Sequence, residues 1–390
     1  MRFAHIADCH IGGWNEPKMK ELGIEAFSKA VSICIEQKLD FVLIAGDLFN
    51  TALPQIELIK EATAELKKLK DNNIPVYIVA GSHDFSPSGK TMLDVLEKAG
   101  LLINVSKLEN NRLEFTTDKT GAKITGMPGK KGGLEKADYE NLDKANLEKE
   151  TGFKIFMFHT AIEEFKPAEM KEMNAQPSSS LPKNFSYYAG GHVHYIFRTK
   201  YNGGLLTFPG ALYPNNFKEM EQYRHGGFYI VDEKLDCTYV PVIVKEVAAL
   251  AIDVSKKSPE EAYAIIKEKV QAEQTEDKII LLRVTGTLAS GKASDIDFKS
   301  IFSTLDSSYF IMKNTSALSS PEAKEFEVKS GTIEEIESEL MTEFSDKTEL
   351  AKALMSVLER EKAEGEKASD YEKRILSEAM KLLKNFHAKE

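Results

Sequence analysis

The sequence lacks the features that are typical of secreted proteins, of membrane-spanning proteins and of proteins that bind polyanions through positive charge. Its 390 residues include three cysteines, Cys9, Cys34 and Cys237, which form no CxxC pair. The sequence therefore predicts no disulfide framework and is typical of a reducing compartment. No apolar run approaches the roughly 20 residues of a membrane span, and the first residues show no signal-peptide pattern. We therefore expect a soluble cytoplasmic protein that contacts no membrane.

An excess of positive charge is also missing. The chain has 51 Lys and Arg against 61 Asp and Glu, which gives a net charge of -10. A protein that held nucleic acid by charge alone would be basic. Any role with a polyanion therefore needs local basic patches or bound metal ions. Hydrophobic residues still make up 42% of the chain, enough for a sizeable core, and the length suits two or three domains.

Short apolar runs alternate with helical patterns in the first part of the chain. Three such runs, at residues 3–7, 41–45 and 76–80, are typical of buried strands. Amphipathic helical spacing fills residues 18–37 and 55–71 between them. Strand, helix, strand, helix, strand indicates an α/β fold with parallel pairing. Later runs predict further strands at 123–126, 154–158, 187–189, 204–208, 227–231 and 238–244. The short connections between the last of these favour antiparallel pairing.

Polar residues that can hold metal follow five of the predicted strands. They are Asp8 and His10, Asp47, Ser82 and His83, His159, and His192 and His194. In an open α/β sheet, ligands bind at the carboxyl ends of the strands, so these residues can converge on one crevice. Carboxylate with imidazole suits manganese, iron(II) or zinc. Two ions about 3.5–4 Å apart clamp a phosphate and activate a water, so the pattern predicts phosphoester hydrolysis.

The order of these motifs resembles the calcineurin-like metallophosphoesterases. The motifs are Asp8-x-His10, Gly46-Asp47, Gly81-Ser82-His83-Asp84, His159 and Gly191-His192-x-His194. Within that family, residues 5–10, 44–49, 187–192 and 227–231 look like the SbcD-type DNA double-strand-break repair nucleases, which partner an SbcC-type coiled-coil ATPase. The resemblance implies an α/β fold with a four-layer metallophosphoesterase sandwich at 1–244. It further implies a small α+β capping domain at 245–325 and a linker with a helical, ATPase-binding tail at 326–390.

The same resemblance assigns roles at the site. It implies that Asp8, His10 and His194 hold one metal ion, that His159 and His192 hold another, and that Asp47 bridges them. Manganese is the expected metal. Ser82 stands where the family usually has an asparagine ligand of the second ion, so we keep it as a candidate ligand. His83 would lie beside the scissile phosphate; the alternative is a structural histidine bonded to Asp84. We interpret His5, inside a strand, as a buried structural or supporting histidine.

The sequence therefore predicts a metal-dependent DNA exo/endonuclease acting at double-strand ends. One alternative is another phosphoesterase of the same fold, although Asp47-Leu48-Phe49 differs from the Asp-x-x-Asp-Arg pattern of protein phosphatases. Another is a DNA-end tether whose catalysis is weakened at Ser82. By resemblance we also expect a homodimer through helices such as residues 18–37. The final apolar stripe, Tyr371, Ile375, Ala379, Leu382 and Phe386, fits either a partner helix or the protein's own core.

Overall fold

The computed structural model describes residues 1–86, 89, 91–170, 172–320, 354, 357 and 368–387. The chain divides into two units, Met1–Pro321 and Glu322–Glu390. The first unit contains two six-stranded sheets and a smaller four-stranded sheet. In the second unit, the described residues include the helix α11 (Ala368–His387). No helix in the described part of the chain is long and apolar enough to cross a membrane.

The first large sheet combines parallel strands with an antiparallel pair, in the order β16-β15-β1-β2-β3-β4. Its parallel strands are β1 (Arg2–Ile6), β2 (Phe41–Ala45), β3 (Val76–Val79) and β4 (Ile103–Asn104). The antiparallel pair is β15 (Gly226–Asp232) and β16 (Cys237–Val242). The parallel pairing predicted for the first three strands is confirmed.

The second large sheet has the order β13-β14-β12-β9-β8-β7. Its strands are β7 (Thr116–Thr117), β8 (Lys123–Met127), β9 (Lys154–His159), β12 (Tyr187–Gly191), β13 (Phe197–Tyr201) and β14 (Gly204–Phe208). The antiparallel pairing predicted for the late strands holds for β15 and β16 but is wrong for β14 and β15, which belong to different sheets. β14 instead pairs antiparallel with β13 and parallel with β12.

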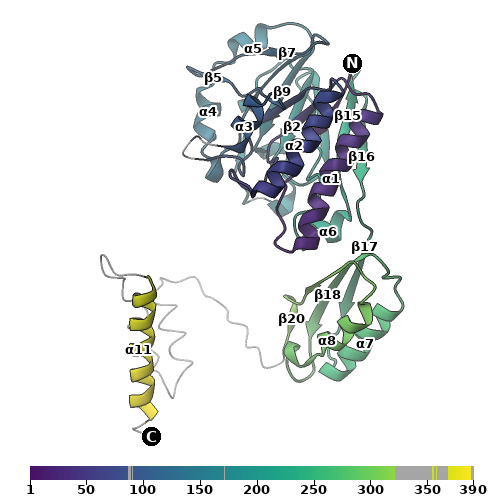
Figure 1. Cartoon of the computed structure of the whole chain (residues 1–390), viewed down its shortest axis with the longest axis vertical. Coiled ribbons are helices and arrows are strands. Elements are labelled where there is room, and N and C mark those ends of the chain that lie inside the picture. Colours follow the sequence, from purple (N-terminus) through teal and green to yellow (C-terminus); the bar gives the residue numbers. More distant parts are fainter. Residues whose placement is uncertain are drawn as a thin grey trace. The chain divides into compact units, whose positions relative to one another are not determined.

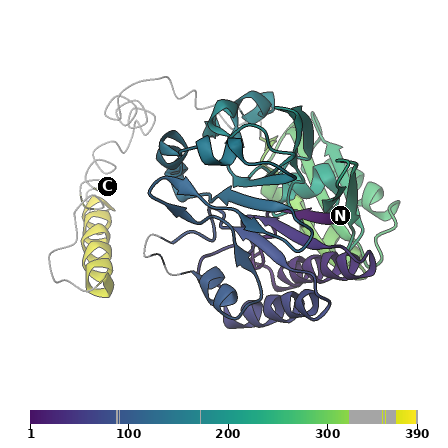
Figure 2. The same cartoon turned by 90° about the horizontal axis from the view of Figure 1, so that it is seen from above.

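The two large sheets pack face to face, and helices cover their outer faces (Figures 1 and 2). Between the sheets, Leu43 of β2 and Met157 of β9 share one buried cluster. On the outer side of the first sheet, Ile44 packs with α1 (Pro17–Glu36) and α2 (Ile56–Asp71). On the outer side of the second, Phe156 packs with α4 (Lys136–Asn141) and α5 (Ala145–Lys149). Both faces of the central strands are therefore buried, which explains their continuous apolar runs.

A smaller sheet follows both large sheets in the chain. Its strands are β17 (Val247–Asp253), β18 (Ile279–Thr287), β19 (Phe310–Asn314) and β20 (Leu318–Ser319), with helices α7 (Pro259–Gln271) and α8 (Phe298–Phe302). Ile280 and Leu282 of β18 pack with the helices in a separate core. Ile279 and Leu281, on the opposite face, join the cluster around α1. We call β17–β20 with α7 and α8 the cap; its predicted boundaries at 244 and 325 stay predictions.

Candidate metal centre

The candidate ligands lie where strands of the two large sheets end. Asp8 and His10 follow β1, Asp47 follows β2, His159 ends β9, and His192 and His194 follow β12. The potential ligand atoms form three groups, each within 4.8 Å: Asp8 with His10 and His194, Asp8 with Asp47 and His159, and His10 with Asp47 and His83. The three residues that the family resemblance assigned to one ion therefore lie together. Asp8, His10 and Asp47 each belong to two of the groups, so the groups overlap in one cluster.

The backbone at these positions is left-handed. The φ angles are 50° at Asp8, 42° at His10, 53° at Asp47 and 87° at His192. Such conformations cost about 1–3 kcal/mol each and persist where the surrounding structure holds them. Here the loops hold one another, since the N–H of Asp8 donates to the Gly46 carbonyl at 3.1 Å and that of His10 to the Asp47 carbonyl at 2.9 Å. The strain is stored where the ligands converge.

Three histidines have one ring nitrogen fixed by an acceptor. Nδ1 of His159 lies 2.8 Å from the Ala45 carbonyl oxygen, Nδ1 of His194 lies 2.9 Å from Glu219 Oε1, and Nδ1 of His83 lies 2.9 Å from the Asn50 carbonyl oxygen. Each Nδ1 therefore carries a hydrogen, which leaves Nε2 as the nitrogen that a metal ion could bind. This is the arrangement of metal-ligating histidines, whose outer nitrogen donates to an oxygen.

The free nitrogens converge at distances that suit shared cations. Nε2 of His10 and Nε2 of His194 lie 3.1 Å apart, and Asp8 Oδ1 lies 3.9 Å from Nε2 of His10, of His194 and of His159. Ligand bonds of about 2.0–2.2 Å place neighbouring ligand atoms roughly 3–4 Å apart. Two imidazole nitrogens that face each other beside a carboxylate form a donor set that a divalent cation satisfies, so these residues fit a metal ion.

Burial and mutual charge shift the acidity of the whole cluster. Burial raises the pKa of Asp8 to about 7, and it lowers the pKa of His10 to about 3 and that of His192 to about 4. Burial also opposes charge on Asp47 and His159, but their mutual attraction outweighs it. The pKa of Asp47 is therefore lowered, and that of His159 is raised to about 10. A cation that takes the place of the His159 proton would be bound in competition with protons.

Ser82 and His83 both contact the shared carboxylate. Ser82 Oγ donates to Asp47 Oδ2 at 3.5 Å, and the His83 N–H donates to Asp47 Oδ1 at 2.7 Å. The His83 ring meets the His10 ring edge-on, with centroids 4.8 Å apart. Both residues therefore lie at the centre, with His83 partly exposed. Ligation by Ser82 stays a prediction.

His192 contributes its backbone as well as its ring. Its N–H donates to the Asp8 carboxylate, at 3.0 Å to Oδ1 and 3.1 Å to Oδ2. Its ring lies beside the His159 ring, with centroids 5.2 Å apart. Among the described residues, the three close groups of potential ligand atoms do not include the nitrogens of His192. Its predicted pairing with His159 at a second ion stays a prediction.

The sequence reasoning missed the role of one carboxylate, Asp84, and missed a second, Glu219, altogether. Asp84 is buried, and its carboxylate accepts the N–H groups of Leu48, Phe49 and Gly81 at 3.1–3.2 Å. It thus joins the loops after β2 and β3 and does not anchor His83. Glu219 binds His194, and its only sequence signal is the spacing Asn216-x-x-Glu219, which indicates a helix start.

His5 is not a ligand candidate. It is fully buried, and its Nδ1 lies 2.9 Å from the Tyr187 hydroxyl and 3.0 Å from the Thr207 hydroxyl. Burial lowers its pKa to about 3, so the ring is neutral. The interpretation of His5 as a buried structural histidine is confirmed.

Comparison with known proteins decides the family. Residues 1–195 match the family described as calcineurin-like phosphoesterase. The chain belongs to the calcineurin-like phosphoesterases. The resemblance noted from the sequence motifs is therefore confirmed, together with the α/β fold class. As a member of this family, the chain is a metal-dependent phosphoesterase.

Two relatives of this phosphoesterase carry the name "DNA double-strand break repair protein Mre11". The one from Methanococcus maripaludis is 31% identical over 297 residues, 71% of this chain and 76% of that protein. The one from Archaeoglobus fulgidus is 31% identical over 230 residues, 56% of this chain and 52% of that protein. The chain thus spans about half the length of the second relative. A solved dimetal phosphatase from Danio rerio aligns with a TM-score of 0.40 at 11% identity, over 62% of this chain and 99% of that chain.

Proposed function

We propose that this phosphoesterase is a two-metal DNA exo/endonuclease that acts at double-strand ends in DNA repair. Asp8, His10 and His194 hold one ion, and His159 with His192 holds the other. The observation that carries the proposal is the position of Asp47. Its Oδ2 lies 3.6 Å from His10 Nε2 and 3.1 Å from His159 Nε2, so one carboxylate oxygen faces both ligand sets. The relatives' names supply the DNA substrate.

Each residue of the centre has a separate task in the proposed mechanism. When bound, two divalent ions polarise a phosphodiester and lower the pKa of an attacking water. Asp47 fixes the spacing between the two ligand sets. The hydrogen bond from His83 Nδ1 to the Asn50 carbonyl leaves Nε2 free for the substrate. Once protonated at Nε2, His83 can stabilise the phosphate or give that proton to the leaving oxygen. Manganese suits the mixed oxygen and nitrogen ligands, and Ser82 is a candidate ligand of the second ion.

We infer two protein contacts beyond the active site. On α11, Leu376 is 65% exposed and Met380 48% exposed, which leaves apolar surface for a helix of an SbcC-type coiled-coil ATPase. On the first unit, Ile24 and Leu58 line a groove between α1 and α2 together with charged side chains such as Lys20 and Glu57. Ile56, which precedes Glu57 in the chain, is 78% exposed. A second copy of the chain is the proposed occupant of that groove.

The three cysteines are free, which is consistent with a cytoplasmic location.

The decisive test is cleavage of linear duplex DNA with added manganese, compared with cleavage of a small phosphodiester. We expect manganese-dependent DNA cleavage by the native protein. Asp47→Ala should lose roughly 100-fold or more, because changes even outside the direct ligands cost 10–100-fold. His83→Ala should lose about 10²–10⁴-fold while still binding manganese, since it removes a proton donor and not a ligand.

Three results would contradict the proposal. Equal cleavage by the native protein and Asp47→Ala would exclude the two-metal mechanism. Hydrolysis of the small phosphodiester without DNA cleavage would indicate a different phosphoesterase. Cleavage that is absent in the native protein and restored by Ser82→Asn would indicate a DNA-end tether with weakened catalysis.

A further inference from the structure

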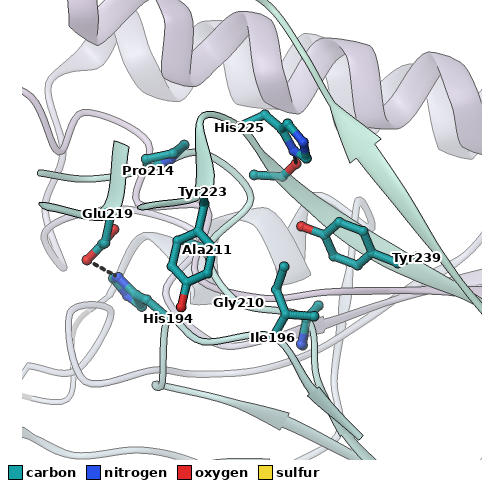
Figure 3. Close-up of a pocket in the computed structure, with 11 residues that line it drawn as sticks. His194, Ile196, Gly210, Ala211, Pro214, Glu219, Tyr223, His225 and Tyr239 are labelled. Carbon is teal, nitrogen blue, oxygen red and sulfur yellow. Dashed lines mark hydrogen bonds and ion pairs between the residues drawn. The ribbon is translucent and has the colours of Figure 1, made fainter. Parts of the chain in front are cut away.

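One short helix, α6 (Phe217–Tyr223), contacts both the candidate metal centre and the cap. Towards the centre, Glu219 Oε1 lies 2.9 Å from Nδ1 of His194, and Figure 3 shows the two side chains facing each other. Towards the cap, Glu221 forms a forked ion pair with Arg283 of β18, with Nε–Oε1 at 2.8 Å and Nη2–Oε2 at 2.7 Å. Two carboxylates, two residues apart, therefore join a ligand histidine to the cap.

The Glu219 carboxylate is held firmly on the centre's side of α6. Its Oε2 accepts the Asn215 N–H at 2.9 Å, and its Oε1 accepts the Asn216 side-chain amide at 2.5 Å. The Asn216 side chain also caps the helix by accepting the Glu219 N–H at 3.0 Å. With Nδ1–H of His194 donated to this carboxylate, Nε2 points to His10. Such outer carboxylates fix the orientation of a ligand histidine and raise its basicity.

The contact with the cap is equally specific. Arg283 and Glu221 are about a quarter exposed, at 26% and 25%, and the Arg283 guanidinium lies 5.0 Å from the centroid of the Phe217 ring. A bidentate guanidinium–carboxylate pair fixes the relative orientation of the two side chains as well as the distance between them. A seven-residue helix cannot hold itself in water. The position of α6 therefore depends on its contacts, and the cap supplies this ion pair.

We propose that Glu219 is a positioning residue for His194, and that Arg283, by holding α6, makes metal affinity at this position depend on how the cap is seated. The inference rests on the metal centre proposed above. A ligand or partner that shifted β18 would pull on Glu221, tilt α6 and turn His194 away from Asp8 and His10. Metal affinity would fall although no direct ligand had changed.

The test is calorimetric titration of manganese into the full-length, metal-free protein without DNA. Glu219→Gln keeps the shape of the side chain but loses the charge that orients His194. The manganese affinity of one of the two sites should therefore fall about 10–100-fold. Arg283→Met should weaken the same affinity by about fivefold, a modest coupling between distant sites. The exchange of both charges, Glu221→Arg with Arg283→Glu, should restore native affinity.

The matched control breaks a different contact of the cap. Tyr309→Phe removes the hydrogen bond of 2.9 Å from the Tyr309 hydroxyl to the Lys18 carbonyl on α1, and it leaves α6 untouched. We expect native manganese affinity from this variant. Thermal unfolding in the presence of chelator shows which variants are folded. If Arg283→Met does not fold, the charge-exchange variant tests whether the ion pair affects metal affinity.

The outcomes separate this inference from the proposed function. A native protein that binds no manganese would overturn the metal centre, and the inference with it. A native protein that binds two ions, with unchanged affinities in Glu219→Gln and Arg283→Met, would overturn the inference alone. Equal weakening in Arg283→Met and Tyr309→Phe would also overturn it, because the effect would then come from a loosened cap and not from α6. The inference would also be overturned if the charge-exchange variant folded but bound manganese more weakly than the native protein.

Discussion

At the scale of single residues, the metal centre depends on glycines, which have no side chain, as much as on its ligands. A Cβ atom on Gly191 would overlap the Ala45 carbonyl oxygen and lie 2.9 Å from His159 Nδ1. A Cβ atom on Gly81 would overlap the Asp47 carboxylate. These glycines let the loop after one strand pass directly over the backbone of another. The ligands can converge only because these neighbours carry no side chain.

Gly191→Ala should therefore be costly, by about 1–3 kcal/mol, because the backbone carbonyl of Ala45 cannot move aside. It should also displace His159 from the Ala45 carbonyl. Urea unfolding of the metal-free protein measures the cost. The control is Gly23→Ala in the middle of α1, where a Cβ atom meets nothing within 4 Å. That change should stabilise the protein by about 0.4–1 kcal/mol, and equal effects at both glycines would contradict the packing argument.

At the scale of elements, helices in the cap begin at side chains that satisfy their free N–H groups. Ser258 precedes α7, and its hydroxyl accepts the Glu261 N–H at 3.3 Å while the Glu261 carboxylate accepts the Ser258 N–H at 3.0 Å. Pro259 occupies the first helical position, where its missing N–H costs nothing. This reciprocal cap fixes where α7 begins on the small sheet.

Ser258→Ala should destabilise the protein by about 1 kcal/mol, because one N–H at the start of α7 loses its acceptor. Ser258→Gly is the matched control, since glycine is tolerated at this position and costs only a few tenths of a kcal/mol. Circular dichroism during urea unfolding gives both values. An alanine variant that unfolds at the same urea concentration as the glycine variant would count against the cap as a source of stability.

The sequence allowed the prediction of those elements whose signal is local. The buried strands β1, β2, β3, β9 and β12 are continuous apolar runs followed by polar ligands, so both the strands and the ligand positions were visible. β13 was missed because its residues alternate between half-buried and exposed. Without β13, β14 had no predicted antiparallel neighbour other than β15, which lies in the other large sheet. Glu219 binds His194 25 residues away, and Asp84 binds the Leu48 N–H 36 residues away. Local patterns carry no signal across such distances.

At the scale of the whole molecule, the chain separates the proposed chemistry from the proposed partner. Every described candidate ligand lies in the unit Met1–Pro321, whereas α11 belongs to the unit Glu322–Glu390. The first unit contains all of the described sheets and buries its own cores. We therefore expect the two activities to be separable by truncation.

Deletion of residues 322–390 should abolish association with an SbcC-type coiled-coil ATPase while manganese-dependent hydrolysis continues. Leu376→Glu should weaken association in the full-length chain, because it places a charge in exposed apolar surface. Ser377→Glu, at a neighbouring exposed residue that is itself polar, should not, because it removes no apolar side chain from the surface formed by Leu376 and Met380. Co-purification with the ATPase measures both. Association that survives the deletion would show that the partner binds elsewhere.

The left-handed backbone at Asp8, His10, Asp47 and His192 has a consequence for redesign. Outside glycine, asparagine, aspartate and histidine are the residues most often found in that conformation. These positions are therefore restricted twice, once by the chain's geometry and once by the need for a ligand atom. A mutant library that seeks a new metal preference here should use an alphabet of Gly, Asn, Asp and His. β-Branched and bulky side chains would be lost at the folding step, before any selection for chemistry began.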